Sequence, residues 1–113
     1  AIFDGSRLFL AGKATTIGAV AYQGSVRRVD PATGNVVWAR GLSAHVYGTP
    51  AGNGARVLAV PTHQGAGTYL LNADTGAVLA TINNGTEFPQ PVFADQYLLL
   101  TSTFANRLDA YTP

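Results

Sequence analysis

The chain contains no cysteine and no methionine, and only 12% of its residues are charged. Without cysteine, disulfides and thiolate metal sites are excluded outright. The absence of methionine, even at position one, indicates a processed protein or a fragment of a longer one. No apolar run approaches the ~20 residues that a membrane helix needs, and no signal peptide is visible, so we expect no membrane insertion.

The few charges that are present are balanced. The formal net charge is +1, and Arg27-Arg28 is the one pair of adjacent basic residues. Nucleic acids and anionic membranes attract clusters of Lys and Arg, so we expect neither as a partner. Hydrophobic residues make up 47% of the chain, which argues against disorder. No stretch of about 11 residues or more shows the i, i+3, i+4 spacing of a helix, so the composition favours strands.

Three stretches share one pattern: a turn-forming start, several apolar residues, then small polar ones. They align without gaps as Gly5–Gly12, Gly54–Pro61 and Asp95–Ser102, at intervals of about 40 to 50 residues. Short apolar runs between turn signals are typical of fully buried strands. Before the second and third runs stand Pro50 and Pro91, and proline suits a short strand with limited pairing.

A second pattern follows each run. Val29–Gly34 reads Val-Asp-Pro-Ala-Thr-Gly and Leu71–Gly76 reads Leu-Asn-Ala-Asp-Thr-Gly, while 108–112 matches only their opening. Asp and Asn hydrogen-bond their own backbone in turns, and Gly accepts positive φ. The first two copies lead into further apolar strands at 35–39 and 77–81, so each predicts a hairpin.

Together these patterns predict a short strand, a turn, a buried strand, a variable loop, a third strand, a turn and an outer strand. Four strands in ~40 residues are the unit of a β-propeller blade. We therefore predict an all-β chain of ten strands, organised as about three four-stranded antiparallel blades of a β-propeller, an incomplete ring. The blades are expected at 1–42, 46–83 and 88–113, the last one lacking its outer strand. The expected partners are the remaining blades of the same protein, or further copies that close the ring.

The turn pattern resembles the tryptophan-docking repeat of quinoprotein propellers, Asp-x-x-Thr-Gly-x-x-x-Trp. The first copy is complete, the second has Asn for Asp and Ala80 for Trp, and the third is partial. The matching residues are Asp30, Thr33, Gly34 and Trp38, then Asn72, Thr75 and Gly76, then Asp109. The resemblance implies that Trp38 packs between neighbouring blades. It also implies a periplasmic or secreted location, since family members are mostly exported.

The family includes dehydrogenases that use pyrroloquinoline quinone and calcium, as well as non-catalytic members with the same blades. In the dehydrogenases the quinone lies beside a vicinal disulfide and a stacking Trp, with calcium held by Glu, Asn and Asp. This chain has no cysteine, one Trp that the repeat already uses, and one Glu. We therefore expect no cofactor here.

Some individual residues suggest chemistry. Asp30, Asn72 and Asp109 recur at one repeat position, so we interpret them as turn-capping residues rather than metal ligands. His45 and His63 are the two histidines of the chain and fall in predicted loops, so they are possible loop contacts. The glycosylation triplet 84–86 and the glycine-rich stretch 65–67 are interpreted as turn and loop.

No acid, base, nucleophile or metal cluster is assembled by these patterns. We therefore expect a non-enzymatic scaffold segment that binds a protein or a ligand, although an enzyme is not excluded. The alternative is a fragment of a quinone-dependent dehydrogenase that lacks the catalytic blades, for which quinone and calcium would be the cofactors. A third hypothesis is a hydrolase or lyase that uses His63 and Asp74.

Overall fold

The computed structural model describes residues 1–46, 49–62, 67–83, 91–95, 97–102 and 107–112. Within these ranges it contains strands, turns and bends but no helix, so the predicted all-β class is confirmed. The described ranges hold thirteen strands, more than the ten expected.

Three antiparallel sheets account for most of the strands. The first sheet holds β1 (Ile2–Phe3), β2 (Leu8–Gly12), β5 (Gly24–Val29) and β6 (Val36–Leu42). The second holds β7 (Ala51–Gly52), β8 (Val57–Pro61), β9 (Thr68–Asn72) and β10 (Val78–Ile82). The third holds β11 (Val92–Ala94), β12 (Tyr97–Ser102) and β13 (Arg107–Tyr111). Each sheet is a meander.

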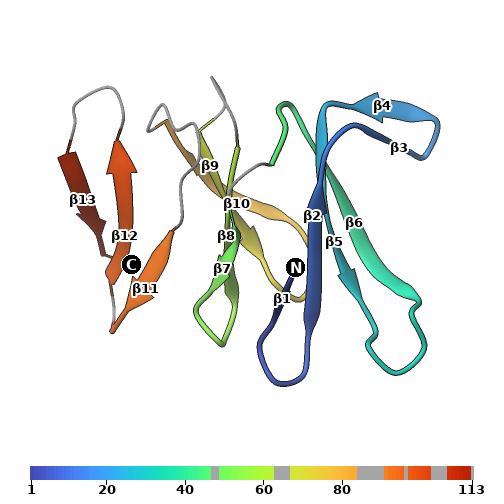
Figure 1. Cartoon of the computed structure of the whole chain (residues 1–113), viewed down its shortest axis with the longest axis horizontal. Helices are drawn as coiled ribbons and strands as arrows, with labels where there is room; N and C mark the ends of the chain where they lie inside the picture. Colours follow the sequence, from blue (N-terminus) through green and yellow to red (C-terminus); the bar gives the residue numbers. More distant parts are fainter. Residues whose placement is uncertain (47–48, 63–66, 84–90, 96, 103–106, 113) are drawn as a thin grey trace.

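The three sheets stand side by side along the longest dimension of the molecule, with the second sheet in the middle (Figure 1). The described chain measures 41 × 31 × 19 Å. Strand β8 shows what this central position requires, because four of its five residues are fully buried. A strand covered on both faces must be apolar throughout, and β8 reads Val-Leu-Ala-Val-Pro.

The remaining strands form a hairpin that the sequence did not predict. β3 (Thr15–Ile17) and β4 (Val20–Tyr22) pair within the segment expected to be a loop. Gly18 and Ala19 connect them with φ of 57° and 66°, which is the positive-φ pair of a tight hairpin turn. The hairpin extends away from the second sheet (Figure 1). Its Tyr22 ring lies over Gly41, where an added Cβ would come within 2.3 Å of the ring.

The structure corrects the ungapped alignment of the repeats. In the first sheet the β1–β2 turn closes with a hydrogen bond from Asp4 N to Arg7 O, whereas the β7–β8 turn closes from Asn53 N to Val57 O. The second turn is therefore one residue longer, and Val57 takes the place of Arg7. The register agrees, because Leu8 pairs with Val29 and Leu58 pairs with Leu71. The repeat hides this insertion because both turns contain Asx-Gly.

The structure also moves Asp109 out of the turn position assigned to it. Asp109 lies inside β13 opposite Leu100, and the strand continues to Tyr111. Tyr111 pairs with Leu98 as Leu71 pairs with Leu58, so Thr112 takes the place of Asn72. The likeness of 108–112 to the turn pattern is thus misleading, because strand register follows the burial of Leu98 and Leu100 rather than a short motif.

Two apolar cores lie between the sheets. The larger core joins the first and second sheets and contains eight buried residues among those described, including Phe9, Val26, Leu58 and Leu71. The smaller core joins the second and third sheets through Ala59, Leu98 and Leu100. Both faces of the second sheet are therefore covered.

Candidate functional site

The turn between β9 and β10 is built by local hydrogen bonds. The Asn72 side-chain oxygen accepts the N–H groups of Asp74 and Thr75, at 2.9 and 3.2 Å. Gly76 N donates to Asn72 O at 2.7 Å and has a φ of 77°, a conformation that glycine adopts without strain. The Thr75 hydroxyl accepts the N–H of Ala77. The sequence Asn-Ala-Asp-Thr-Gly thus specifies one rigid turn.

The equivalent turn of the first sheet has the same design. Asp30 accepts the N–H of Ala32 through its carboxylate, and Gly34 N donates to Asp30 O at 2.7 Å. Thr33 accepts the N–H of Asn35. Asp30 and Asn72 therefore act in the turns that contain them, and neither belongs to a metal-binding cluster among the described residues.

The β9–β10 turn is the point at which the second sheet meets the first. Trp38 Nε1 donates to Ala73 O at 3.0 Å, and Arg40 Nε donates to Gly76 O at 2.8 Å. The indole ring lies so close that a Cβ on Gly76 would come within 2.5 Å of it. On its own sheet the indole lies near Phe9, with ring centroids 6.1 Å apart. Trp38 therefore bridges two sheets.

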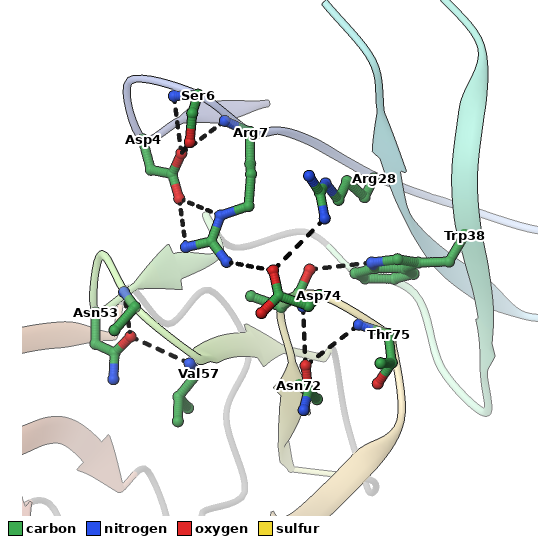
Figure 2. Close-up of polar contacts among 12 residues, drawn as sticks. Asp4, Ser6, Arg7, Arg28, Trp38, Asn53, Val57, Asn72, Asp74 and Thr75 are labelled. Carbon is green, nitrogen blue, oxygen red and sulfur yellow. Dashed lines mark hydrogen bonds and ion pairs between the residues drawn. The ribbon is translucent and has the colours of Figure 1, made fainter.

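A charged cluster extends this contact (Figure 2). The Arg7 guanidinium pairs with Asp4 at 2.7 Å and reaches Asp74 in the β9–β10 turn at 3.1 Å. Arg28 approaches the same Asp74 carboxylate at 3.6 Å. Asp74 is largely exposed, so its two ion pairs contribute little stability individually, whereas the Arg7–Asp4 pair is mostly covered.

Burial and hydrogen bonding act in opposite directions on Asp4. Burial raises the pKa of its carboxyl, but the hydrogen bonds from Arg7 and Ser6 and the charge of Arg7 outweigh burial and lower the pKa from 3.8 to about 2. For Arg7, burial lowers the pKa, while hydrogen bonds and attraction from Asp4 and Asp74 outweigh burial and raise the pKa above its usual value. Both groups are therefore charged at neutral pH.

The second and third sheets meet differently. A cleft of about 220 Å³ lies between them, below the range of roughly 300–1,000 Å³ that drug-sized ligands fill. Its apolar lining includes Val57, Leu70 and Phe93, and its polar lining includes Asn53, Asp95 and Tyr111. An apolar cleft with a few polar groups is the usual form of a small-molecule site.

This cleft exists because small side chains replace large ones. Val57 takes the place of Arg7, as the turn hydrogen bonds show. Arg28 pairs with Trp38 in the first sheet, and Leu70 pairs with Ala80 at the same place in the second. Two arginines and the tryptophan thus fill the first contact, and valine, leucine and alanine leave space in the second.

Of the two histidines, only His45 lies in the part of the chain that the structure describes. His45 is half-buried in the connection that follows β6. His63, Glu87, most of the glycine-rich stretch 65–67 and the triplet 84–86 lie outside the described residues. Asp74, named in the hydrolase hypothesis, pairs with Arg7 and Arg28. Among the residues that the structure describes, no three His, Cys, Asp or Glu side chains lie together where they could hold a metal ion.

Sequence reasoning missed the arginines of the inter-sheet contact. Arg28 and Arg40 flank Trp38 through the β5–β6 pairing, because Arg28 lies opposite Trp38 and Val26 lies opposite Arg40. Side chains on a strand alternate between its two faces, so Arg40, two residues after Trp38, is expected on the same face as Trp38. That alternation could have identified Arg40 from the sequence. Arg7 carries no such signal, because its partner Asp74 is 67 residues away in the chain.

No protein-family model matches the chain. No curated protein matches it either. Within the described ranges, no helix is long and apolar enough to cross a bilayer.

Proposed function

We propose that the chain is a non-enzymatic scaffold segment of a β-propeller of the quinoprotein type. The observation that supports this most directly is Trp38, which is anchored on one sheet and donates a hydrogen bond to the turn of the next. Three antiparallel meanders packed side by side, the first two joined through this contact, are the arrangement that propeller blades need. Further sheets would then cover the outer faces of the first and third sheets.

The cleft between the second and third sheets is our candidate for ligand binding. It combines an apolar lining with the Asp95 carboxylate and the Tyr111 side chain. A small apolar molecule that carries a hydrogen-bond donor fits this lining. Binding there would leave the contact around Trp38 untouched.

The architecture is tested by a crystal structure of the chain. In a propeller, successive sheets fan around a common axis, whereas in a layered sandwich they stack without one. Sheets stacked without a common axis would overturn the proposal.

The alternative, a segment of a quinone-dependent dehydrogenase, is tested by adding pyrroloquinoline quinone and Ca²⁺. We expect no cofactor absorbance to remain with the protein after gel filtration and no change in its melting temperature. A retained quinone spectrum would instead support the alternative, a segment of a quinone-dependent dehydrogenase.

Ligand binding is tested by titrating a library of small amines and alcohols into ¹⁵N-labelled protein. We expect amide shifts at Phe93 and Leu98 and none at Phe9, which lies in the other core. Val57→Arg should abolish the shifts, because it restores the side chain that occupies this place in the first contact. Shifts that persist in Val57→Arg would remove the cleft as the site.

A further inference from the structure

Two sheet faces of the molecule are apolar and open. On the outer face of the first sheet, Phe3 is 59% exposed and Leu10 is 40% exposed. On the outer face of the third sheet, Leu108 is 63% exposed, Val92 47% and Tyr97 40%. Exposed apolar side chains grouped on one sheet face mark an interaction surface.

The strand registers show what each face is built to contact. Leu8 takes the place that Leu58 and Leu98 occupy in the other sheets, as its pairing with Val29 shows. Leu58 and Leu98 are both buried in the core that faces the preceding sheet. The outer face of the first sheet is therefore the type of surface that a preceding sheet covers.

The third sheet shows the opposite surface. Leu99 lies on its outer face, opposite Val92 and Ala110. It corresponds to Phe9 and Ala59, each of which is buried toward the following sheet. One chain thus carries both halves of a contact that it already makes twice internally.

The charges on these faces agree with such a contact. Among the described side chains, the outer face of the third sheet carries no charge, and that of the first carries Arg27. Arg27 donates to Ser25 and to Thr15 in the β3–β4 hairpin. The hairpin covers the Gly41 end of this face through Tyr22 and leaves Phe3 and Leu10 open.

We propose that the outer face of the third sheet in one copy of this chain docks on the outer face of the first sheet in a second copy. The proposal rests on the stacked-sheet architecture of the proposed function. The contact is head-to-tail, so its two surfaces differ, and it continues until a ring closes. Two copies bring six sheets together, within the range of about 4–8 that propellers use.

The test measures mass in solution by size-exclusion chromatography with light scattering. The wild-type chain of 11.7 kDa should elute with twice its own mass. Phe3→Lys and Leu108→Lys should each raise the dimer dissociation constant by at least about tenfold, because each places a charge in the contact. Val78→Lys is the matched control, since Val78 is 46% exposed on the outer strand β10 and should leave the dimer intact.

Mixing the two variants gives the sharpest result. In a mixed head-to-tail dimer, one contact pairs the intact third sheet of Phe3→Lys with the intact first sheet of Leu108→Lys, while the other contact carries both lysines. The mixture should therefore contain more dimer than either variant alone at the same total concentration. A contact between two identical faces predicts that only one of the variants weakens the dimer and that mixing restores nothing. That result would overturn the proposal.

The wild-type measurement separates this proposal from the one on which it rests. A wild-type chain that is monomeric at ~100 µM and whose Trp38 emission shows a partly buried indole would end the self-association proposal and leave the scaffold proposal standing. A solvent-exposed Trp38 would end both. Far-UV circular dichroism and Trp38 emission establish that each variant is folded before its mass is interpreted.

Discussion

Gly34 and Gly76 have nearly the same backbone conformation in equivalent turns, with φ of 78° and 77°. They differ in what lies next to them. A Cβ on Gly34 would meet nothing within 4 Å, whereas a Cβ on Gly76 would strike the Trp38 ring at 2.5 Å. The pair therefore separates the effect of backbone strain from that of inter-sheet packing.

We expect Gly76→Ala to lower the free energy of unfolding by about 2–4 kcal/mol and to shift Trp38 emission to the red, because the indole is displaced. Gly34→Ala should cost about 1 kcal/mol, the strain of positive φ alone, with no spectral change. Urea titration followed by fluorescence measures both. Equal costs for the two variants would show that Trp38 is not seated on Gly76.

Asp4 makes stability depend on pH in the acid range. Its folded-state pKa of about 2 lies below its usual value of 3.8, so the stabilisation is complete above pH ~4 and is lost as pH falls toward 2. Asp4→Asn should lower stability at pH 7 by about 1–2 kcal/mol and flatten the pH dependence between 4 and 2. Asn53 shows that an amide supports the same turn, because its oxygen accepts the N–H groups of Ala55 and Val57. Urea titrations between pH 2 and 7 measure this dependence. If the free energy of unfolding of Asp4→Asn falls with pH as steeply as that of the wild type, Asp4 is not the group responsible.

At the scale of the elements, the length of a turn sets the register of the strand that follows it. The β7–β8 turn is one residue longer than the β1–β2 turn. Deleting Ala55 shortens it to the length of its counterpart, so β8 keeps its register and the deletion should cost no more than about 1 kcal/mol. Under the ungapped alignment the same deletion would turn Leu58 and Val60 to the wrong face and unfold the protein. Circular dichroism with urea titration distinguishes these outcomes.

The positions of strands were predictable where a local run of apolar residues marked them. β2, β8 and β12 lie where the nearly continuous apolar runs predicted buried strands. Of these three, β8 is covered on both faces, whereas Leu10 of β2 and Tyr97 of β12 are each 40% exposed. The β3–β4 hairpin was not predictable, because Thr15–Tyr22 alternates weakly and depends on Gly41, 19 residues after Tyr22, for the space its ring fills. Local patterns do not report a space that a distant glycine provides.

At the scale of the whole molecule the two inter-sheet contacts differ in strength. The first contains eight buried core residues among those described, together with the hydrogen bonds of Trp38 and Arg40. The second contains three buried core residues and borders the cleft. Local opening follows the weaker packing. We therefore expect β12 and β13 amides to exchange hydrogen at least about tenfold faster than those of β8 and β9.

Native-state hydrogen exchange followed by mass spectrometry measures this difference. Val57→Arg is the informative variant, because filling the cleft should slow exchange in β12. Uniform exchange across all three sheets would show that the chain opens as one cooperative unit.

The sequence alone determined that this protein is built from strands, and where its turns at Asp30 and Asn72 close, since both depend on neighbours within a few residues. The tertiary structure decided the rest: the longer β7–β8 turn, the place of Asp109 within β13, and the union of Arg7, Asp74 and Trp38 in one contact. The hydrogen bonds that close the turns at Asp30 and Asn72 join residues only a few positions apart, so the local sequence specifies them. Register and contacts between sheets are set by which apolar side chains find cover, and that depends on residues far apart in the chain.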